Sequence, residues 1–338
     1  MSKTFLFLMS CMCLYAGPVD FGKSELQTAL GARGMVMSIE TEINLDQPET
    51  YRIAVVKGAS VRVSGGDLRG LMYGLIEASE QIRNEGKFTA KSAQPGLSHR
   101  GVRLAASDAD LAQPAFYSTD RWLAFYQMLA RNRVNRFTLV LPSERMELDR
   151  IRFLSRTANE FGVDFVLGVR PPLGNRSLYA QLRKVLDECV LVRGIEVQIG
   201  REPVEFFRTV VFPALQESGR RVALDLHGAE TRPDVIRAAK AMGLVLDVTG
   251  RASSAPADFK SLDFHALIAA DAAVPEADPV RTRLTSIANT GAAGFEIDLP
   301  GPNIENYERT YWAWGRLGYD HLSPTLGVGS PPAKANKK

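Results

Sequence analysis

Residues 194–227 read GIEVQIGREPVEFFRTVVFPALQESGRRVALDLH, and the fold can be worked out from their pattern. Apolar and polar residues alternate over 194–200 and again over 222–227, which predicts a strand in each place. The residues between them, 203–219, have the apolar spacing of a helix. A strand, a helix and a second strand in this order predict a βαβ unit with two parallel strands.

The same pattern continues on both sides of this unit. Helical patterns lie between most neighbouring strands, although the link between the sixth and seventh is short and rich in Ser, Ala and Pro. Eight βα units predict a (β/α)₈ TIM barrel. An open doubly wound sheet is the rival fold, but no Gly-rich phosphate-binding turn follows the first strand. The predicted strands are 101–106, 136–141, 164–169, 194–200, 222–227, 244–249, 264–270 and 294–299.

A small α+β unit is predicted before the barrel. Segment 24–34 has the pattern of a short helix with Ser24 as its N-cap, and three strand-like segments follow it. A second helix starts after Asp67, which is a typical N-cap residue. The apolar face of this second helix is predicted to carry Leu71, Leu75, Ala78 and Ile82.

Composition sets the expected domain boundaries. The small α+β domain spans 18–85, and the segment 86–98 has the composition of a linker. The barrel follows over 99–322, and a Pro- and Lys-rich tail occupies 323–338. Residues 1–17 precede the small domain and differ from it because they are mostly apolar.

Residues 1–17 resemble an export signal. Lys3 is followed by an uncharged apolar run, and LYA before Gly17 fits a cleavage site. We therefore expect a secreted or periplasmic protein, while a buried N-terminal strand or a misassigned start is the alternative. The sequence LMSC at 8–11 loosely resembles a lipoprotein box, which would attach a lipid anchor at Cys11. The apolar run is too short to span a bilayer, and cleavage would leave Cys189 without a disulfide partner.

Charge and histidine content exclude several function classes. The chain has 41 basic and 38 acidic residues, a net charge of +3, so we expect no nucleic-acid partner. It contains four histidines, and none stand at the spacing of a metal-binding motif. We therefore expect neither a metal-dependent hydrolase nor a cofactor.

Strand parity predicts which side chains fill the lumen of the barrel. The apolar set of each strand should meet the helices, so the alternate set should point inward. A structural barrel would fill its lumen with Val, Ile and Leu, whereas this one places charged residues there. Buried charges need partners, and we expect ion pairs among Arg103, Glu196, Asp225, Asp247 and Glu296.

The same parity places other polar residues at the C-terminal ends of strands, where barrel enzymes carry out chemistry. This group consists of Arg170, Glu202, His227 and Asp298. Glu202 has a second explanation, because it stands just before Pro203 at the start of a helix, where acidic residues are favourable. The sequence leaves both explanations open.

Three segments resemble a known class of proteins. They are SVRVSGGDLRGLMYGLIEASEQI at 60–82, LSHRGVRL at 97–104 and STDRWLAFYQMLARNRVNRFTLVLP at 118–142. Together they resemble exo-acting glycoside hydrolases of the β-N-acetylhexosaminidase and family 67 α-glucuronidase type. Those proteins carry a small hexosaminidase domain 2-like domain before a catalytic (β/α)₈ barrel. The resemblance is good over about residues 20–142 and weak beyond them.

The resemblance implies roles for several residues. Glu202 matches the glutamate after strand 4 that serves as the acid, and Arg100 matches a sugar-binding arginine of strand 1. The alternative role for Arg100 is a structural link to the linker segment that precedes it. The hexosaminidase Asp-Glu pair is absent because Arg201 precedes Glu202, which argues against substrate-assisted chemistry. The loop after strand 6 also lacks the aromatic residues that relatives use for sugar stacking.

We therefore expect an exo-acting glycoside hydrolase whose substrate is a carbohydrate that contains a uronic acid. Two carboxyl groups of the enzyme would carry out the hydrolysis. Glu202 is the expected acid and Asp298 its partner, with Asp225 or Glu230 as alternatives. Arginine and histidine side chains would bind the sugar, and arginine suits a uronate because its fork pairs both oxygens. The substrate-binding residues expected are Arg100, Arg103, Arg170, His227 and Glu230. The alternative is a catalytically degenerate barrel that acts as a carbohydrate-binding or scaffold protein.

Overall fold

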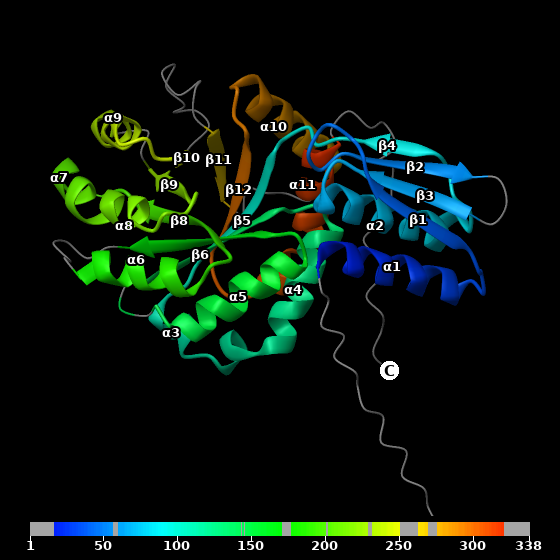
Figure 1. The fold of residues 1–338 in the computed structure, drawn as a ribbon, viewed down its shortest axis with the longest axis horizontal. Coiled ribbons are helices and arrows are strands. Elements are labelled where there is room, and N and C mark those ends of the chain that lie inside the picture. Colours follow the sequence, from blue (N-terminus) through cyan, green and yellow to red (C-terminus); the bar gives the residue numbers. More distant parts are fainter. Residues whose placement is uncertain are drawn as a thin grey trace, which may run out of the picture.

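The computed structural model describes two packed units, a small α+β unit and a barrel (Figure 1). The predicted export segment and the predicted tail lie outside the described residues. No helix of the described part is long and apolar enough to cross a membrane. The structure describes residues 17–56, 60–142, 144, 146–170, 177–200, 202–228, 232–250, 263–269 and 276–320.

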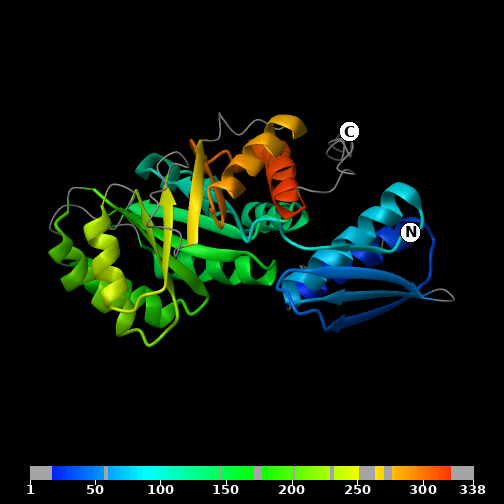
Figure 2. The ribbon, with the colours of Figure 1, turned by 90° about the horizontal axis from the view of Figure 1, so that it is seen from above.

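The small unit is a four-stranded sheet with two helices. Its strands run in the order β1-β3-β2-β4, and β1 and β3 are parallel while β2 is antiparallel to β3 and to β4. Helix α2 packs against β2 and β3, and α1 packs along α2 (Figure 2). The elements are α1 (Pro18–Ala32), β1 (Ser38–Ile43), β2 (Tyr51–Val56), β3 (Ser60–Gly65), α2 (Leu68–Glu85) and β4 (Lys91–Ala93).

Helix α2 follows its prediction closely. The Asp67 side chain accepts a hydrogen bond of 2.7 Å from the Gly70 N–H, as an N-cap residue does. Gly86 ends the helix with a φ of 69°, a left-handed conformation that favours glycine. The predicted apolar face is buried at all four positions, Leu71, Leu75, Ala78 and Ile82.

Two details of the small unit differ from the prediction. Helix α1 starts at Pro18 and not near Ser24, because proline fits the first turn of a helix, where its missing N–H costs no hydrogen bond. The predicted linker contains β4, which pairs with β2 at Tyr51–Ala93. A strand of three residues has too short a pattern to stand out in a polar segment.

The predicted barrel is confirmed. Eight parallel strands close in sequence order from β5 to β12, and β12 pairs with β5. Each predicted strand matches an observed one within two residues at either end. The strands are β5 (His99–Ala105), β6 (Arg136–Pro142), β7 (Asp164–Arg170), β8 (Val192–Gln198), β9 (Ala223–His227), β10 (Leu246–Gly250), β11 (Asp263–Ala269) and β12 (Gly294–Leu299).

Helical segments surround the described barrel. The helix predicted over 203–219 contains a π-helical turn, η3, next to Pro213, whose nitrogen cannot donate a helical hydrogen bond. The segments are α3 (Asp108–Leu111), η1 (Pro114–Tyr117), α4 (Thr119–Arg131), α5 (Leu148–Glu160), α6 (Ser177–Glu188), α7 (Val204–Phe206), η3 (Phe207–Val211), α8 (Phe212–Gln216), α9 (Pro233–Ala241), α10 (Ala277–Asn289), η7 (Ile304–Tyr307) and α11 (Glu308–Tyr319).

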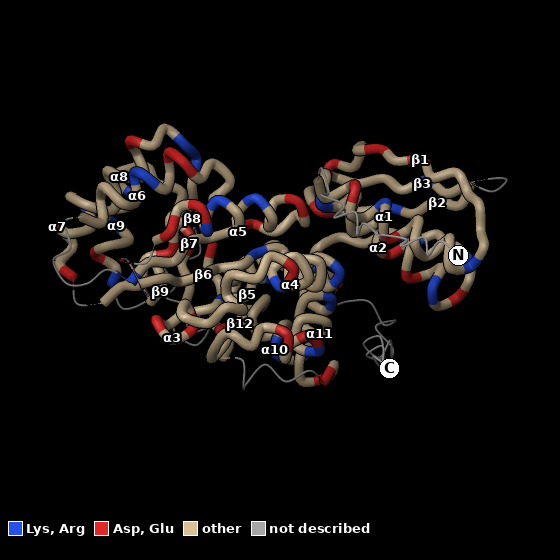
Figure 3. The backbone as a smooth tube through the Cα atoms, turned by 90° about the horizontal axis from the view of Figure 1, so that it is seen from below, with Lys and Arg blue, Asp and Glu red and all other residues tan. Residues whose placement is uncertain are grey.

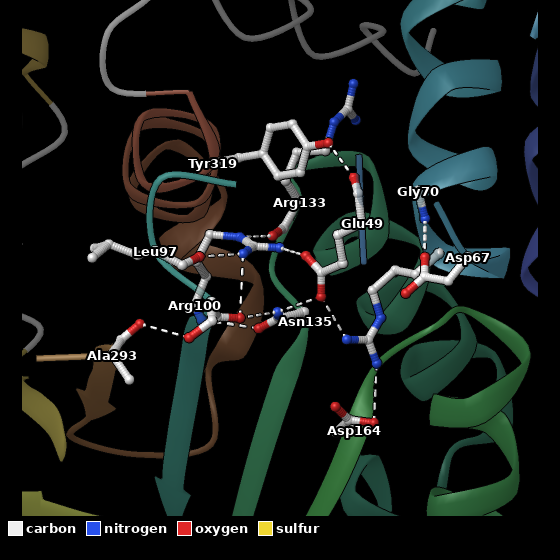
Figure 4. A network of polar contacts seen from close by, with 12 residues as sticks. Glu49, Asp67, Gly70, Leu97, Arg100, Arg133, Asn135, Asp164, Ala293 and Tyr319 are labelled. Atoms are coloured by element: carbon white, nitrogen blue, oxygen red, sulfur yellow. Dashed lines mark hydrogen bonds and ion pairs between the residues drawn. The ribbon is translucent and has the colours of Figure 1, made fainter. Parts of the chain in front are cut away.

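The small unit contacts the barrel at the N-terminal ends of the strands (Figure 4). Glu49, which precedes β2, is the centre of this junction. Its carboxylate accepts hydrogen bonds from Arg69 and Asn135 at 2.7 and 2.8 Å, and also from Arg100. Arg69 bridges in addition to Asp164, at the start of β7, at 3.0 Å. The opposite end of the barrel, where the strands finish, is therefore not covered by the small unit.

Candidate functional site

Ion pairs across the lumen confirm the predicted strand parity. Two clusters of buried charge lie inside the barrel, and acidic residues are seen along its strands in Figure 3. The first, the Arg136 cluster, consists of Arg136, Asp225, Asp247 and Glu296. The second, the Arg103 cluster, consists of Arg103, Glu196 and Asp298.

The Arg136 cluster joins four strands around one guanidinium. Arg136, the first residue of β6, donates to Asp247 at 2.8 Å and to Glu296 at 2.7 Å, and also to Asp225. Its exposed fraction is 5%, and its three partners are as deeply buried. Gly101 leaves the space that Glu296 occupies, because a Cβ at that position would lie 2.7 Å from Glu296 Cγ. The cluster is a structural filling of the barrel.

Asp225 has the most perturbed environment in the Arg136 cluster. Burial raises the pKa of Asp225 well above its usual range, and the nearby Glu296 raises it further against the opposing effect of Arg136. Thr249 donates a hydrogen bond of 2.8 Å to Asp225 Oδ2. With no exposed surface, Asp225 lies too deep to contact a substrate at the mouth.

The Arg103 cluster lies one layer closer to the C-terminal strand ends, which we call the mouth. Arg103 donates two bonds to Glu196 Oε1 and one to Oε2, at 2.8 to 3.1 Å, and a further bond of 2.8 Å to Asp298. Arg103 and Glu196 are buried, whereas the Asp298 side chain is 34% exposed. Asp298 is therefore the member of this cluster that a ligand can reach.

His227, the last residue of β9, extends this arrangement across the mouth. Its Nδ1 lies 4.0 Å from Glu196 Oε2, and its side chain is 14% exposed. This Nδ1 is buried and has no hydrogen-bond partner among the described residues. The chain Asp298–Arg103–Glu196–His227 thus connects four strands below the mouth, and the partly exposed His227 side chain lies at its end.

Glu202 lies between β8 and α7. Its carboxylate folds back to accept a hydrogen bond of 2.9 Å from the Gly200 N–H, and the residue is 6% exposed. Pro203, not Glu202, is the N-cap of α7. Arg232 donates to the Glu202 backbone oxygen at 2.9 Å. The carboxylate is therefore held at the strand end by the backbone of its own loop, and it does not cap the helix.

The remaining expected substrate-binding residues have different surroundings. Arg170 ends β7 and is exposed, and no acidic side chain in the described part of the chain pairs with it. Arg100 has no exposed surface and donates to Glu49 and to the Leu97 and Arg133 carbonyls at the opposite end of the barrel. These contacts match the alternative role of Arg100, which is a structural link to the segment that precedes β5. Glu230 lies outside the described residues.

Sequence reasoning missed three lumen residues, namely Arg136, Thr138 and His265. The alternation in RFTLVL carried the signal for the first two, because Phe137, Leu139 and Leu141 form its apolar set. Thr138 donates a hydrogen bond of 2.8 Å to Glu296. His265 of β11 is fully buried, and its ring lies 4.3 Å from that of His99. Burial lowers the pKa of His265 well below its usual range, so its ring is neutral.

Among the described residues, two groups in the lumen have a spacing at which they could hold a metal ion. The first is Asp225, Asp247 and His265, and the second is Glu196, Asp225 and Glu296. In each group, one ligand atom from every residue lies within 4.8 Å of the others. Both groups contain Asp225, and all five residues are buried.

Comparison with known proteins identifies the fold. No protein-family model and no curated protein matches the chain. A GH138 enzyme targeting pectin rhamnogalacturonan II shares the fold with a TM-score of 0.75 and 17% identity, over 91% of this chain and 50% of its own. A GH115 4-O-methyl-α-glucuronidase with specificity for decorated arabinogalactans shares the fold with a TM-score of 0.61 and 12% identity. The match covers 89% of this chain and 55% of that structure's chain.

A glycoside hydrolase family 20 β-N-acetylglucosaminidase also shares the fold, with a TM-score of 0.55 and 15% identity, over 87% of this chain and 86% of its own. The chain spans about half the length of the GH138 and GH115 structures. The suspected likeness to TIM-barrel exo-glycosidases is confirmed at the level of the fold. At these identities the likeness defines architecture alone, and function has to be argued from the site.

Proposed function

We propose that this chain is a glycoside hydrolase that works with carboxylate acid–base chemistry at the mouth of its barrel. The observation that carries the proposal is the position of Glu202, Asp298 and His227, which lie at the C-terminal ends of strands in a fold shared with glycoside hydrolases. That end of a TIM barrel is where active sites are built.

In this proposal Glu202 is the general acid and Asp298 the second carboxylate. Glycoside hydrolysis needs one carboxyl group to protonate the leaving oxygen and another to activate water or attack the sugar. Asp298 is paired with Arg103, which fixes its position, as the second role requires. The His227 side chain is partly exposed at the end of β9, where it is available to contact a sugar hydroxyl.

We further propose an exo-acting enzyme for a carbohydrate that carries a uronic acid. Arg170 supports this, because it is exposed at a strand end and is not paired with an acidic side chain of the described residues. A guanidinium binds a carboxylate through two parallel hydrogen bonds. The predicted export signal would place the enzyme outside the cytoplasm.

Activity on a panel of aryl glycosides and aryl uronides tests this function. Glu202→Gln should lower kcat by about 10²- to 10⁴-fold, the usual contribution of general acid catalysis. Glu205→Gln is the matched control, because Glu205 lies three residues away with an exposed side chain, and it should retain full activity. Turnover that survives Glu202→Gln would remove Glu202 from the acid role.

A carbohydrate-binding barrel without catalysis is the second candidate. It is favoured by the ion pair between Asp298 and Arg103 and by the deep burial of Glu202, which together leave little free carboxylate at the mouth. Isothermal titration with uronic-acid oligosaccharides separates the two candidates. Binding without turnover on any member of the panel would support this second function and would contradict the first.

A further inference from the structure

Three consecutive strands bring two aspartates and a histidine together inside the barrel. Asp225 of β9 and Asp247 of β10 are direct partners in the strand register. His265 of β11 is the partner of Thr249, two residues further along β10. One ligand atom from each of the three residues lies within 4.8 Å of the other two. No sequence motif announces this group, because the three residues come from separate strands.

The group contains buried polar atoms that lack hydrogen-bond partners. Both ring nitrogens of His265 and Asp225 Oδ1 are buried without a partner among the described residues. His265 has no exposed surface, so solvent does not satisfy its nitrogens. A buried polar group without a partner is costly, and such groups in a folded protein call for an explanation.

The charge around the group is also unbalanced. The Arg136 cluster holds three carboxylates against one guanidinium, and the Arg103 cluster holds two against one. Buried carboxylates need compensation by protons or by cations. A divalent cation would supply two positive charges at the place where the acidic groups are densest.

We propose that Asp225, Asp247 and His265 bind a zinc ion inside the barrel. Two carboxylate oxygens and one imidazole nitrogen are ligands that zinc accepts, at about 2.0–2.2 Å. Arg136 donates to Oδ2 of both aspartates, so the other oxygen of each carboxylate remains for the ion.

The proposed ion has a structural role. Its ligands are at most 4% exposed, so a substrate at the mouth would not contact it. It would tie β9, β10 and β11 together beneath His227, and β9 and β10 share only two register pairs in the described structure. This inference is independent of the proposed hydrolase activity, since it concerns the lumen and not the mouth.

Zinc content tests the proposal directly. The full chain is unfolded in guanidinium chloride with a chelator, refolded with ZnCl₂, freed of unbound metal and analysed by mass spectrometry. We expect about one zinc per chain in the natural sequence and less than about a tenth of that in Asp225→Asn and His265→Asn. His99→Asn is the matched control, because its ring lies against His265 but belongs to neither group, and it should keep its zinc.

Thermal unfolding supplies a second readout that does not depend on every variant folding equally well. Zinc should raise the unfolding midpoint of the natural chain, because an ion that binds only the folded state stabilises it, and it should leave Asp225→Asn unchanged. A natural chain that refolds without zinc and shows no shift when zinc is added would overturn the proposal. So would zinc retention in both Asp225→Asn and His265→Asn.

Discussion

Arg136 compensates more buried charge than any other side chain of the described lumen. Its guanidinium contacts Asp225, Asp247 and Glu296, which come from three different strands. All three carboxylates are buried. Removing one partner of a buried charge network leaves the others uncompensated, and this costs far more than the loss of a surface ion pair.

Arg136→Met should therefore lower the free energy of unfolding at pH 7 by about 3–5 kcal/mol, the range measured when one partner of a buried ion pair is removed. Urea unfolding followed by circular dichroism measures the change. Arg152→Met is the control, because Arg152 pairs with Asp149 and Glu188 at the surface, and it should cost at most about 1 kcal/mol. Equal losses in the two variants would show that the Arg136 cluster contributes no more than surface charge does.

At this scale the sequence predicted the inward position of the lumen carboxylates but not all their partners. Asp225 and Glu296 follow from strict alternation in β9 and β12. Arg136 pairs with both carboxylates only because the barrel is closed, since the three residues are far apart in sequence. Parity could not decide between the two roles of Arg100, because it stands one residue before the inward-facing Gly101 and its partner Glu49 lies in the other unit.

Among the elements, helix α2 shows how one side chain can set a boundary. Asp67 satisfies the Gly70 N–H, one of the donors that the first turn of a helix leaves without a partner. The helix then presents its apolar face to the sheet, and Gly86 ends it. This is the element for which local sequence rules and the observed bounds agree best.

Asp67→Ala should lower the free energy of unfolding by about 1 kcal/mol, because it removes the N-cap acceptor. Asp67→Asn should stay close to the natural chain, since its amide oxygen can accept the same hydrogen bond. Thermal or urea unfolding of the three proteins provides the comparison. A loss of the same size in Asp67→Asn would assign the effect to the carboxylate charge and not to the cap.

The strands were predictable because each carries an apolar run or an alternating pattern over five to seven residues, from β5 to β12. Short elements were not, and β4 and the π-helical turn η3 are examples. The candidate site could be predicted from the sequence only in part. Parity placed Asp298 and His227 at the mouth, but the backbone contact of Glu202 with Gly200 depends on the local loop conformation, which alternation does not report.

On the scale of the whole molecule, the two ends of the barrel have different surroundings. The small unit packs on the N-terminal strand ends through Glu49, Arg69 and Arg100, and the candidate site lies at the other end. Glu49 adopts a left-handed backbone conformation, with a φ of 60°. That conformation is unusual for a residue with a side chain, and here the contacts of the Glu49 carboxylate hold it in place.

Glu49 makes this junction sensitive to acid. Burial alone would raise the pKa of Glu49, but Arg100 and Arg69 outweigh it and lower that pKa to about 2. A carboxylate with a lowered pKa in the folded state stabilises the protein above its unfolded pKa, here 4.5. That stabilisation is lost as the pH falls from about 4.5 towards 2.

Comparison of the natural chain with Glu49→Gln isolates this contribution. Urea unfolding is measured at several pH values between about 5.5 and 3, where linkage predicts a loss of about 2 kcal/mol from this one group. The difference in unfolding free energy between the two proteins should therefore shrink by about 2 kcal/mol over that range. Glu42→Gln, a change on the small sheet away from the junction, should leave the pH dependence of the natural chain in place. If Glu49→Gln and the natural chain lose stability in parallel as the pH falls, then other carboxylates govern the acid sensitivity and the junction does not depend on the charge of Glu49.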